Sequence, residues 1–128
     1  MIVEETKTIR YRMVEGDVLE MIYKDNIALG VAETEENHQL YLQFIQGKTS
    51  FKRLVILGKN MSVNADARLL CKKFDEEESH KITAQATVCQ TYLNKILAYV
   101  YFKMLAPKYA NKVFSNRQFA LDWLMKIN

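Results

Sequence analysis

The run Leu54-Val55-Ile56-Leu57 decides the fold class of this chain of 128 residues. It holds four apolar residues without a polar break, and turn-forming segments flank it, with Gly58 directly after it. A short continuous apolar run between turn signals is typical of a central parallel strand, because other layers cover both of its faces. We therefore predict a strand over residues 51–57 at the centre of a sheet.

A hairpin and a helix are predicted before this strand. Residues 6–14 alternate polar and apolar side chains, residues 18–23 form a second β-rich run, and residues 15–17 suit the turn between them. A helix is predicted over residues 29–46, with Gly47 at its C-terminal cap. Two stripes of this helix suit burial equally well: Leu40 with Phe44, and Tyr41 with Ile45.

Alternation of helix and strand continues after the central strand. Asn64 suits the N-cap of a helix whose predicted buried face is Ala67, Leu70, Cys71 and Phe74. The acidic run at residues 75–78 is then a solvated face, and residues 82–89 form the next strand. A helix over residues 90–105 follows, with a predicted core face of Leu93, Ile96, Leu97, Val100 and Met104.

The C-terminal segment carries two helix-start signals. Residues 112–114 suit a short edge strand, after which Ser115 and Gln118 form a predicted capping box. Phe114 and Phe119 form a predicted hydrophobic staple across it. The predicted buried face of this helix is Phe119, Ala120, Trp123, Leu124 and Ile127.

The element order is therefore β-β-α-β-α-β-α-β-α. This order predicts one α/β domain spanning residues 1–128, with an N-terminal β-hairpin followed by alternating helices and strands. We expect a mixed, largely parallel sheet of about five strands with about four helices.

Composition and charge narrow the function classes. The chain has 18 basic and 15 acidic residues scattered along it, for a net charge of +3, so we expect no nucleic-acid partner. No apolar run is long enough for a membrane span. The N-terminus has no export signal, and the two cysteines fit no metal spacing, so we expect reduced thiols in the cytoplasm.

Residues for catalysis are not grouped in the sequence. His38 and His80 have no chemical neighbours, no Gly-rich loop opens a helix, and no carboxylate pair stands apart from the surface acids. Cys89 ends a strand before a helix, where it is either activated by the helix N-terminus or simply a small buried side chain. We expect no enzyme activity, no cofactor and no metal site.

The helix at residues 90–105 is apolar around most of its circumference. The aromatic side of this helix is either partly exposed, with the tyrosine hydroxyls in contact with water, or covered by another molecule. That molecule would be a partner protein, a second copy of the chain, or a small apolar ligand. The residues proposed for this interface or pocket are Tyr92, Tyr99, Phe102 and Met104.

The ending Lys112-Val113-Phe114-Ser115-Asn116-Arg117-Gln118-Phe119-Ala120-Leu121-Asp122-Trp123-Leu124 resembles the SpoIIAA-like small bacterial proteins of the STAS (anti-sigma-factor antagonist) superfamily. In that superfamily the last helix commonly follows a Phe-Ser/Thr step and carries an Ala-Leu-x-Trp-Leu ending. The resemblance covers nearly the whole chain in element order, and its motif is confined to the last dozen residues or so. It implies a SpoIIAA-like fold.

The same resemblance directs attention to the start of the helix after the central strand. Antagonist members are phosphorylated there on a serine, usually in an Asp-Ser-x-Gly setting. The matching positions hold Asn64, Ala65, Asp66 and Ala67, and Ala65 has no hydroxyl. Ser62 lies three residues earlier, and we do not assign it the role. The resemblance thus implies a module that lacks the phosphoacceptor serine.

Taken together, these features predict a non-catalytic regulatory or protein-interaction module. Its partner, or a second copy in a homodimer, is expected on the aromatic helix or on the loop that contains Gly58, Ser62, Asn64, Ala65 and Asp66. The alternative is a carrier or sensor of a small apolar, lipid-like ligand.

Overall fold

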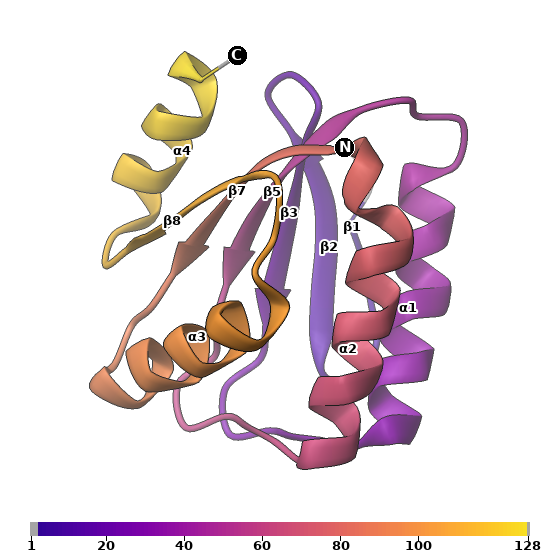
Figure 1. Cartoon of the computed structure of the whole chain (residues 1–128), viewed down its shortest axis with the longest axis vertical. Helices are drawn as coiled ribbons and strands as arrows, with labels where there is room; N and C mark the ends of the chain where they lie inside the picture. The colour runs from indigo at the N-terminus through magenta and orange to yellow at the C-terminus, as the bar shows by residue number, and fades with distance from the viewer. Residues whose placement is uncertain (1–2, 128) are drawn as a thin grey trace.

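A six-stranded sheet forms the centre of the computed structural model, which describes residues 3–127 (Figure 1). Its strand order is β1-β2-β3-β5-β7-β8, and a small second sheet pairs β4 with β6. The strands are β1 (Val3–Glu5), β2 (Ile9–Val14), β3 (Val18–Tyr23), β4 (Ala28–Leu29), β5 (Phe51–Ile56), β6 (Ser62–Val63), β7 (Ile82–Val88) and β8 (Ala110–Phe114). The helices are α1 (Val31–Ile45), α2 (Ala65–Glu78), the 3-10 turn η1 (Ser79–Lys81), α3 (Tyr92–Leu105) and α4 (Arg117–Lys126).

The sheet is mixed and largely parallel, as predicted. β1, β2 and β3 form an antiparallel meander, whereas β3, β5, β7 and β8 run parallel. The central position of β5 between β3 and β7 confirms the prediction from its unbroken apolar run. The sixth strand is β1, which pairs with β2 through Val3 opposite Arg12. Sequence patterning missed it because it is only three residues long and exposed.

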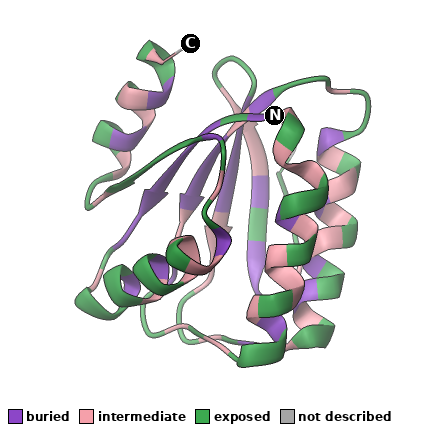
Figure 2. Ribbon diagram, in the orientation of Figure 1, coloured by how far each residue is buried: buried purple, intermediate pink, exposed green. Residues whose placement is uncertain are grey.

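Helices cover both faces of the sheet. One apolar core lies under α1, α2 and α3 and includes Leu19, Val55 and Tyr41, and the other lies under α4 and includes Val18, Leu54 and Leu124. Alternating residues of β3 and β5 therefore enter opposite cores, since successive side chains of a strand point to opposite faces. Figure 2 shows the resulting burial of the central strands beneath helices with exposed outer faces.

The structure decides which faces of α1 and α3 are buried. On α1 the Tyr41/Ile45 stripe is buried, which resolves the ambiguity. On α3 the predicted core face was wrong for three of its five residues, because Leu93, Ile96 and Val100 are 65%, 44% and 45% exposed. The other two, Leu97 and Met104, are half-buried. Buried polar bonds set the rotation of α3. Asn94 donates to the Gly58 carbonyl (3.0 Å) and accepts from the Gln90 amide (2.9 Å), so its side of the helix faces inward.

The start of the last helix also differs from the prediction. Its N-cap is Asn116, whose side chain accepts from the Phe119 amide (3.1 Å), so the predicted Ser115 cap was wrong by one residue. The hydrophobic staple was wrong as well, because Phe119 is 67% exposed. Phe114 instead packs near Trp123, with ring centroids 5.8 Å apart. Burial of Ala120 and Leu124 on the sheet sets this rotation of α4.

A buried carboxylate fastens α4 to the sheet. Glu20 is fully buried on β3 and accepts hydrogen bonds from Arg12 of β2 and from Arg117 of α4, the latter at 2.6 Å. Burial raises the pKa of Glu20, but the bonds from Arg117 and Arg12 outweigh it, so the pKa lies below its ordinary value. Lys52 completes the attachment by donating to the carbonyls of Leu124 and Ile127 at the end of α4.

We predict that Glu20→Gln lowers the free energy of unfolding by about 1–3 kcal/mol near neutral pH, because two guanidinium groups lose a charged acceptor. A carboxylate with a lowered pKa stabilises the fold above its unfolded-state pKa of about 4.3, and the effect is lost as the pH falls through the folded-state value. Wild-type stability should thus fall more steeply than that of Glu20→Gln between about pH 5 and pH 3. Urea denaturation at several pH values measures how the free energy of unfolding changes with pH for each protein. The control is Glu4→Gln, at an exposed position of β1. Parallel slopes for wild type and Glu20→Gln would contradict the prediction.

Candidate functional site

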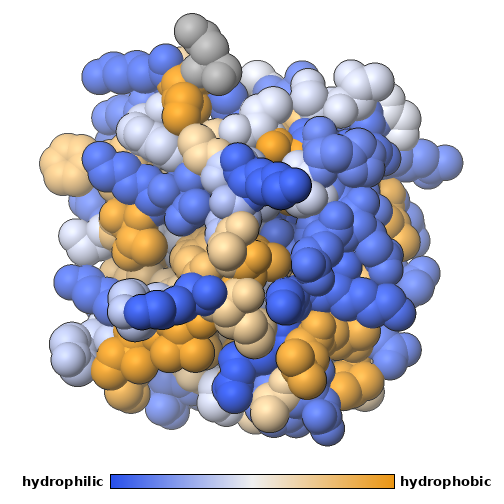
Figure 3. Space-filling view, viewed as in Figure 1, coloured by the Kyte–Doolittle hydropathy of each residue, from blue (hydrophilic) through white to orange (hydrophobic). Residues whose placement is uncertain are grey.

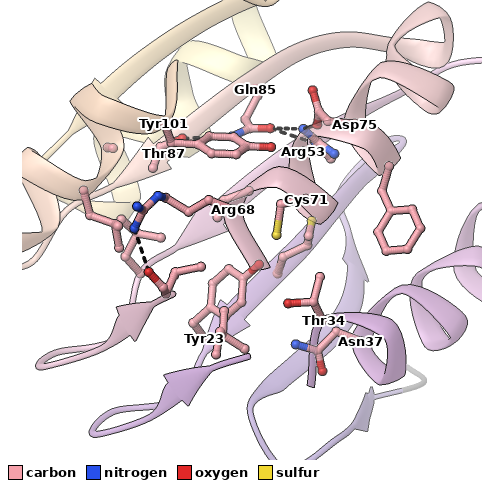
Figure 4. A pocket seen from close by; sticks show the side chains of 18 of the residues that line it. Tyr23, Thr34, Asn37, Arg53, Arg68, Cys71, Asp75, Gln85, Thr87 and Tyr101 are labelled. Atoms are coloured by element: carbon pink, nitrogen blue, oxygen red, sulfur yellow. Dashed lines mark hydrogen bonds and ion pairs between the residues drawn. The ribbon is translucent and has the colours of Figure 1, made fainter. Parts of the chain in front are cut away.

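A cavity of about 160 Å³ lies between the sheet and the three helices on one face (Figure 4). Residues from α1, α2, α3 and strands β2, β3, β5 and β7 line it. Its apolar surface comes from Met21, Leu29, Val55, Leu57, Met61, Val63, Leu97, Ala98 and Phe102. The predicted buried face of α2 closes one side, with Cys71 and Phe74 on the lining and Ala67 fully buried beneath the helix.

One wall of the cavity is a buried ion pair with a complete set of partners. Arg53 on β5 donates to the Asp75 carboxylate of α2, to Gln85 Oε1 (2.8 Å from Nε) and to the hydroxyls of Tyr109 (3.1 Å) and Tyr41 (3.4 Å). Tyr109 in turn donates to Asp75 Oδ2 (2.9 Å). Burial raises the pKa of both tyrosines, so both hydroxyls stay neutral. The prediction that Asp75 belongs to a solvated acidic face was wrong.

Other polar groups on the lining have fewer partners. Arg68 on α2 donates to the Val63 carbonyl (2.8 Å), and no carboxylate lies within ion-pair distance of it among residues 3–127. The hydroxyls of Tyr23 and Tyr101 also border the cavity. Burial raises the pKa of each, and no hydrogen bond within the described chain offsets this. Burial likewise raises the pKa of Cys71, which is therefore a thiol.

His38 lies at the edge of the same cavity. Its ring stacks on Phe74 with centroids 3.6 Å apart and planes within 2°, and Tyr41 lies 5.8 Å away. Burial lowers its pKa, so the imidazole is neutral near pH 7. His80 lies apart, in η1. The two histidines are thus not brought together.

The predicted partner loop is divided by the fold. Gly58 is buried, and a Cβ at this position would lie only 2.0 Å from the Lys24 carbonyl oxygen. Ser62, Ala65 and Asp66 are exposed. Asn64 is also exposed, and its side chain caps α2 by accepting from the Ala67 amide (2.8 Å), as predicted. The exposed members surround the start of α2, beside the β4–β6 pair.

The four aromatic-helix candidates fall into different environments. Phe102 lines the cavity, Met104 is half-buried, and Tyr92 and Tyr99 are 76% and 63% exposed. The outer face of α3 is an apolar stripe made of Tyr92, Leu93, Ile96, Tyr99 and Val100. Figure 3 shows hydrophobic surface over this helix, at the lower left of the view.

The remaining candidates for chemistry do not form a site. Cys89 is buried at the end of β7, and burial raises the pKa of its thiol, which is opposite to the activation considered from sequence. Within residues 3–127, no group of three or more His, Cys, Asp or Glu side chains could hold a metal ion. None of the helices in the same range has the length and apolarity that crossing a membrane requires.

Sequence patterning missed most of the cavity wall. Arg53, Gln85 and Thr87 are polar positions inside buried strands, and that combination was the available signal. Arg68 and Asp75 had no such signal, because both lie outside the predicted buried face of their helix, and Asp75 was placed in the solvated acidic run. Tyr101 and Tyr109 are aromatic residues whose partners are distant in sequence.

The architecture is similar to a solved SpoIIAA-like structure. An uncharacterised protein of the DUF3478 family from Shewanella loihica PV-4, described as having a SpoIIAA-like fold, matches with a TM-score of 0.69 and 18% identity over 91% of both chains. This confirms the predicted SpoIIAA-like fold. The chain belongs to the family described as a domain of unknown function, DUF7793, whose model matches residues 11–128. No curated protein sequence matches it significantly.

We predict that Asp75→Asn lowers the free energy of unfolding by about 3–5 kcal/mol, because it leaves Arg53 buried without a counter-charge. Urea denaturation at neutral pH measures the loss. Glu76→Gln, the exposed next residue on α2, should change stability little. Equal stability of Asp75→Asn and Glu76→Gln would contradict the role given to the pair.

Proposed function

We propose that this protein is a non-catalytic interaction module of STAS type, which binds a partner protein through the outer face of α3. The observation that carries the proposal is the contiguous exposed stripe of five large apolar residues on one helix. Exposed apolar patches of this kind usually mark interaction surfaces, and aromatic residues are enriched in them. The module would act in the cytoplasm, consistent with two unpaired cysteines.

The positive charge of α3 favours a different protein, and not a second copy of this chain, as the partner of its outer face. α3 contains Lys95 and Lys103 and no acidic residue. Lys103 donates to the Tyr99 hydroxyl (3.1 Å) and lies 5.3 Å from the centre of that ring. Two copies that met through this face would bring the same lysines together. A partner with apolar side chains bordered by carboxylates would complement it.

Regulation by phosphorylation at the start of α2 is not part of the proposal. Ala65 is the first residue of α2 and is exposed, at the position where the resemblance places the phosphoacceptor serine. A methyl side chain offers no oxygen for phosphate transfer. Partner binding would thus be controlled by something other than a phosphoserine at this position.

Site-specific cross-linking tests the proposed surface. A photoreactive benzoylphenylalanine in place of Tyr99 should capture the partner in the cells that express the protein, and the partner is then purified for binding measurements. We expect Leu93→Glu and Ile96→Glu to weaken binding at least about tenfold without loss of stability, because both side chains are already exposed. Added salt should weaken binding, since lysines border the face.

The control is Leu69→Glu, an equally apolar substitution site on α2 that is 58% exposed. It should bind as wild type does. Wild-type affinity in the two α3 variants would contradict the proposal. Sedimentation as a dimer that Leu93→Glu dissociates would contradict it as well, and would assign the face to a second copy of the chain.

The cavity supports a second candidate function, a sensor or carrier of a small molecule with an apolar body. Its volume of about 160 Å³ compares with the ~150 Å³ of an engineered apolar cavity that binds benzene. The inner face of α3 forms part of the lining through Leu97, Ala98 and Phe102.

We predict that native mass spectrometry of freshly purified protein detects a bound small molecule, and that Ala98→Leu abolishes it by filling the cavity. Ala98 is suited to this test because it lines the cavity and is 4% exposed. The control is Val100→Ala, on the outer face of the same helix. A protein that carries no ligand and binds no small aromatic probe would contradict this candidate.

A further inference from the structure

We infer that the cavity is a binding site for a small organic acid, whose apolar body packs against the inner face of α3 and whose carboxylate is bound by Arg68. This inference rests on the second candidate function and adds the chemical class of the ligand. It follows from which polar groups of the cavity already have partners and which do not.

Arg53 is not available to a ligand. Its donors are directed at Asp75, Gln85, Tyr41 and Tyr109, and Asp75 accepts from both Arg53 and Tyr109. The positive and negative charges of this wall therefore balance within the protein. The wall can limit the length of a ligand, but it offers no free charge to bind one.

Arg68 is the charge on the lining that lacks a counter-charge. Its Nη1 donates to a neutral carbonyl, that of Val63, which leaves the other donors of the guanidinium without a protein acceptor among the hydrogen bonds of residues 3–127. The bond to Val63 also holds the side chain along the cavity (Figure 4). A guanidinium presents paired donors that match the two oxygens of a carboxylate.

The hydroxyls of Tyr23 and Tyr101 supply further donors. Both border the cavity, and burial raises the pKa of each, so both keep their protons. The other titratable groups on the lining add no negative charge: His38 is neutral near pH 7, Cys71 is a thiol, and Asp75 is paired with Arg53. The site thus combines one cation with neutral donors, which favours an anion over a cation or a neutral amide.

Size limits the apolar body. A volume of about 160 Å³ holds roughly one aromatic ring or a short chain, and not a long acyl chain. Aromatic and thioether side chains, including Phe102 and Met61, form the surface against which such a body would lie. The ligand class is therefore a monocyclic aromatic or short aliphatic carboxylic acid.

Phenylacetate and phenylacetamide are matched probes for this inference, because they share a ring and differ in charge. Titration calorimetry on the full chain should show phenylacetate binding at least about tenfold more tightly than phenylacetamide, which corresponds to about 1.4 kcal/mol. Arg68→Gln should remove the preference and leave phenylacetamide binding unchanged. Lys73→Gln, an exposed charge removal on the same helix, should keep the preference.

Each outcome separates the ligand class from the cavity function. Equal affinity for the two probes in wild-type protein overturns the acid assignment and leaves the second candidate function standing. Binding of neither probe overturns the acid assignment, and together with the absence of a bound molecule in native mass spectrometry it overturns the second candidate function as well. A preference that persists in Arg68→Gln overturns the role of Arg68. Arg68→Lys retains the charge and should keep part of the preference, which provides a folded comparison if Arg68→Gln is unstable.

Discussion

The buried ion pair between Arg53 and Asp75 is the constraint on which the packing of α2 against the sheet depends. A guanidinium buried in the central strand requires a counter-charge, so α2 is held with Asp75 facing the sheet. Gln85 of β7 and Tyr109, just before β8, complete the set of partners. One side chain thus connects the central strand with α2, β7 and the segment that enters the edge strand.

α3 connects the two candidate functions. Its inner face includes Ala98 and Phe102 on the cavity lining, and its outer face presents Leu93 and Tyr99 to solvent. The hydrogen bond from Asn94 to the Gly58 carbonyl fixes the rotation of the helix, and so determines which residues face inward and which face solvent. A ligand beneath the helix and a partner above it would contact opposite sides of the same 14-residue element.

The SpoIIAA-like fold is compatible with several kinds of activity, because function depends on the site a fold carries and not on the fold alone. This member of the DUF7793 family combines the fold with two features of its own residues: a basic apolar helix face and a cavity with an uncompensated Arg68. The similar solved structure shares 18% identity, so it supports the architecture and not these features.

The sequence alone determined the order of the elements and the parallel centre of the sheet, because hydrophobic periodicity and capping residues such as Asn64 act locally. The SpoIIAA-like fold was implied separately, by the resemblance of residues 112–124 to that superfamily. Only the tertiary structure decided which face of α3 is buried, where α4 begins, and that Asp75 lies inside. Those outcomes depend on partners distant in sequence: Asn94 with Gly58, Ala120 with the sheet, and Asp75 with Arg53. A local pattern identifies an apolar face, but it cannot show which polar residue will find a buried partner.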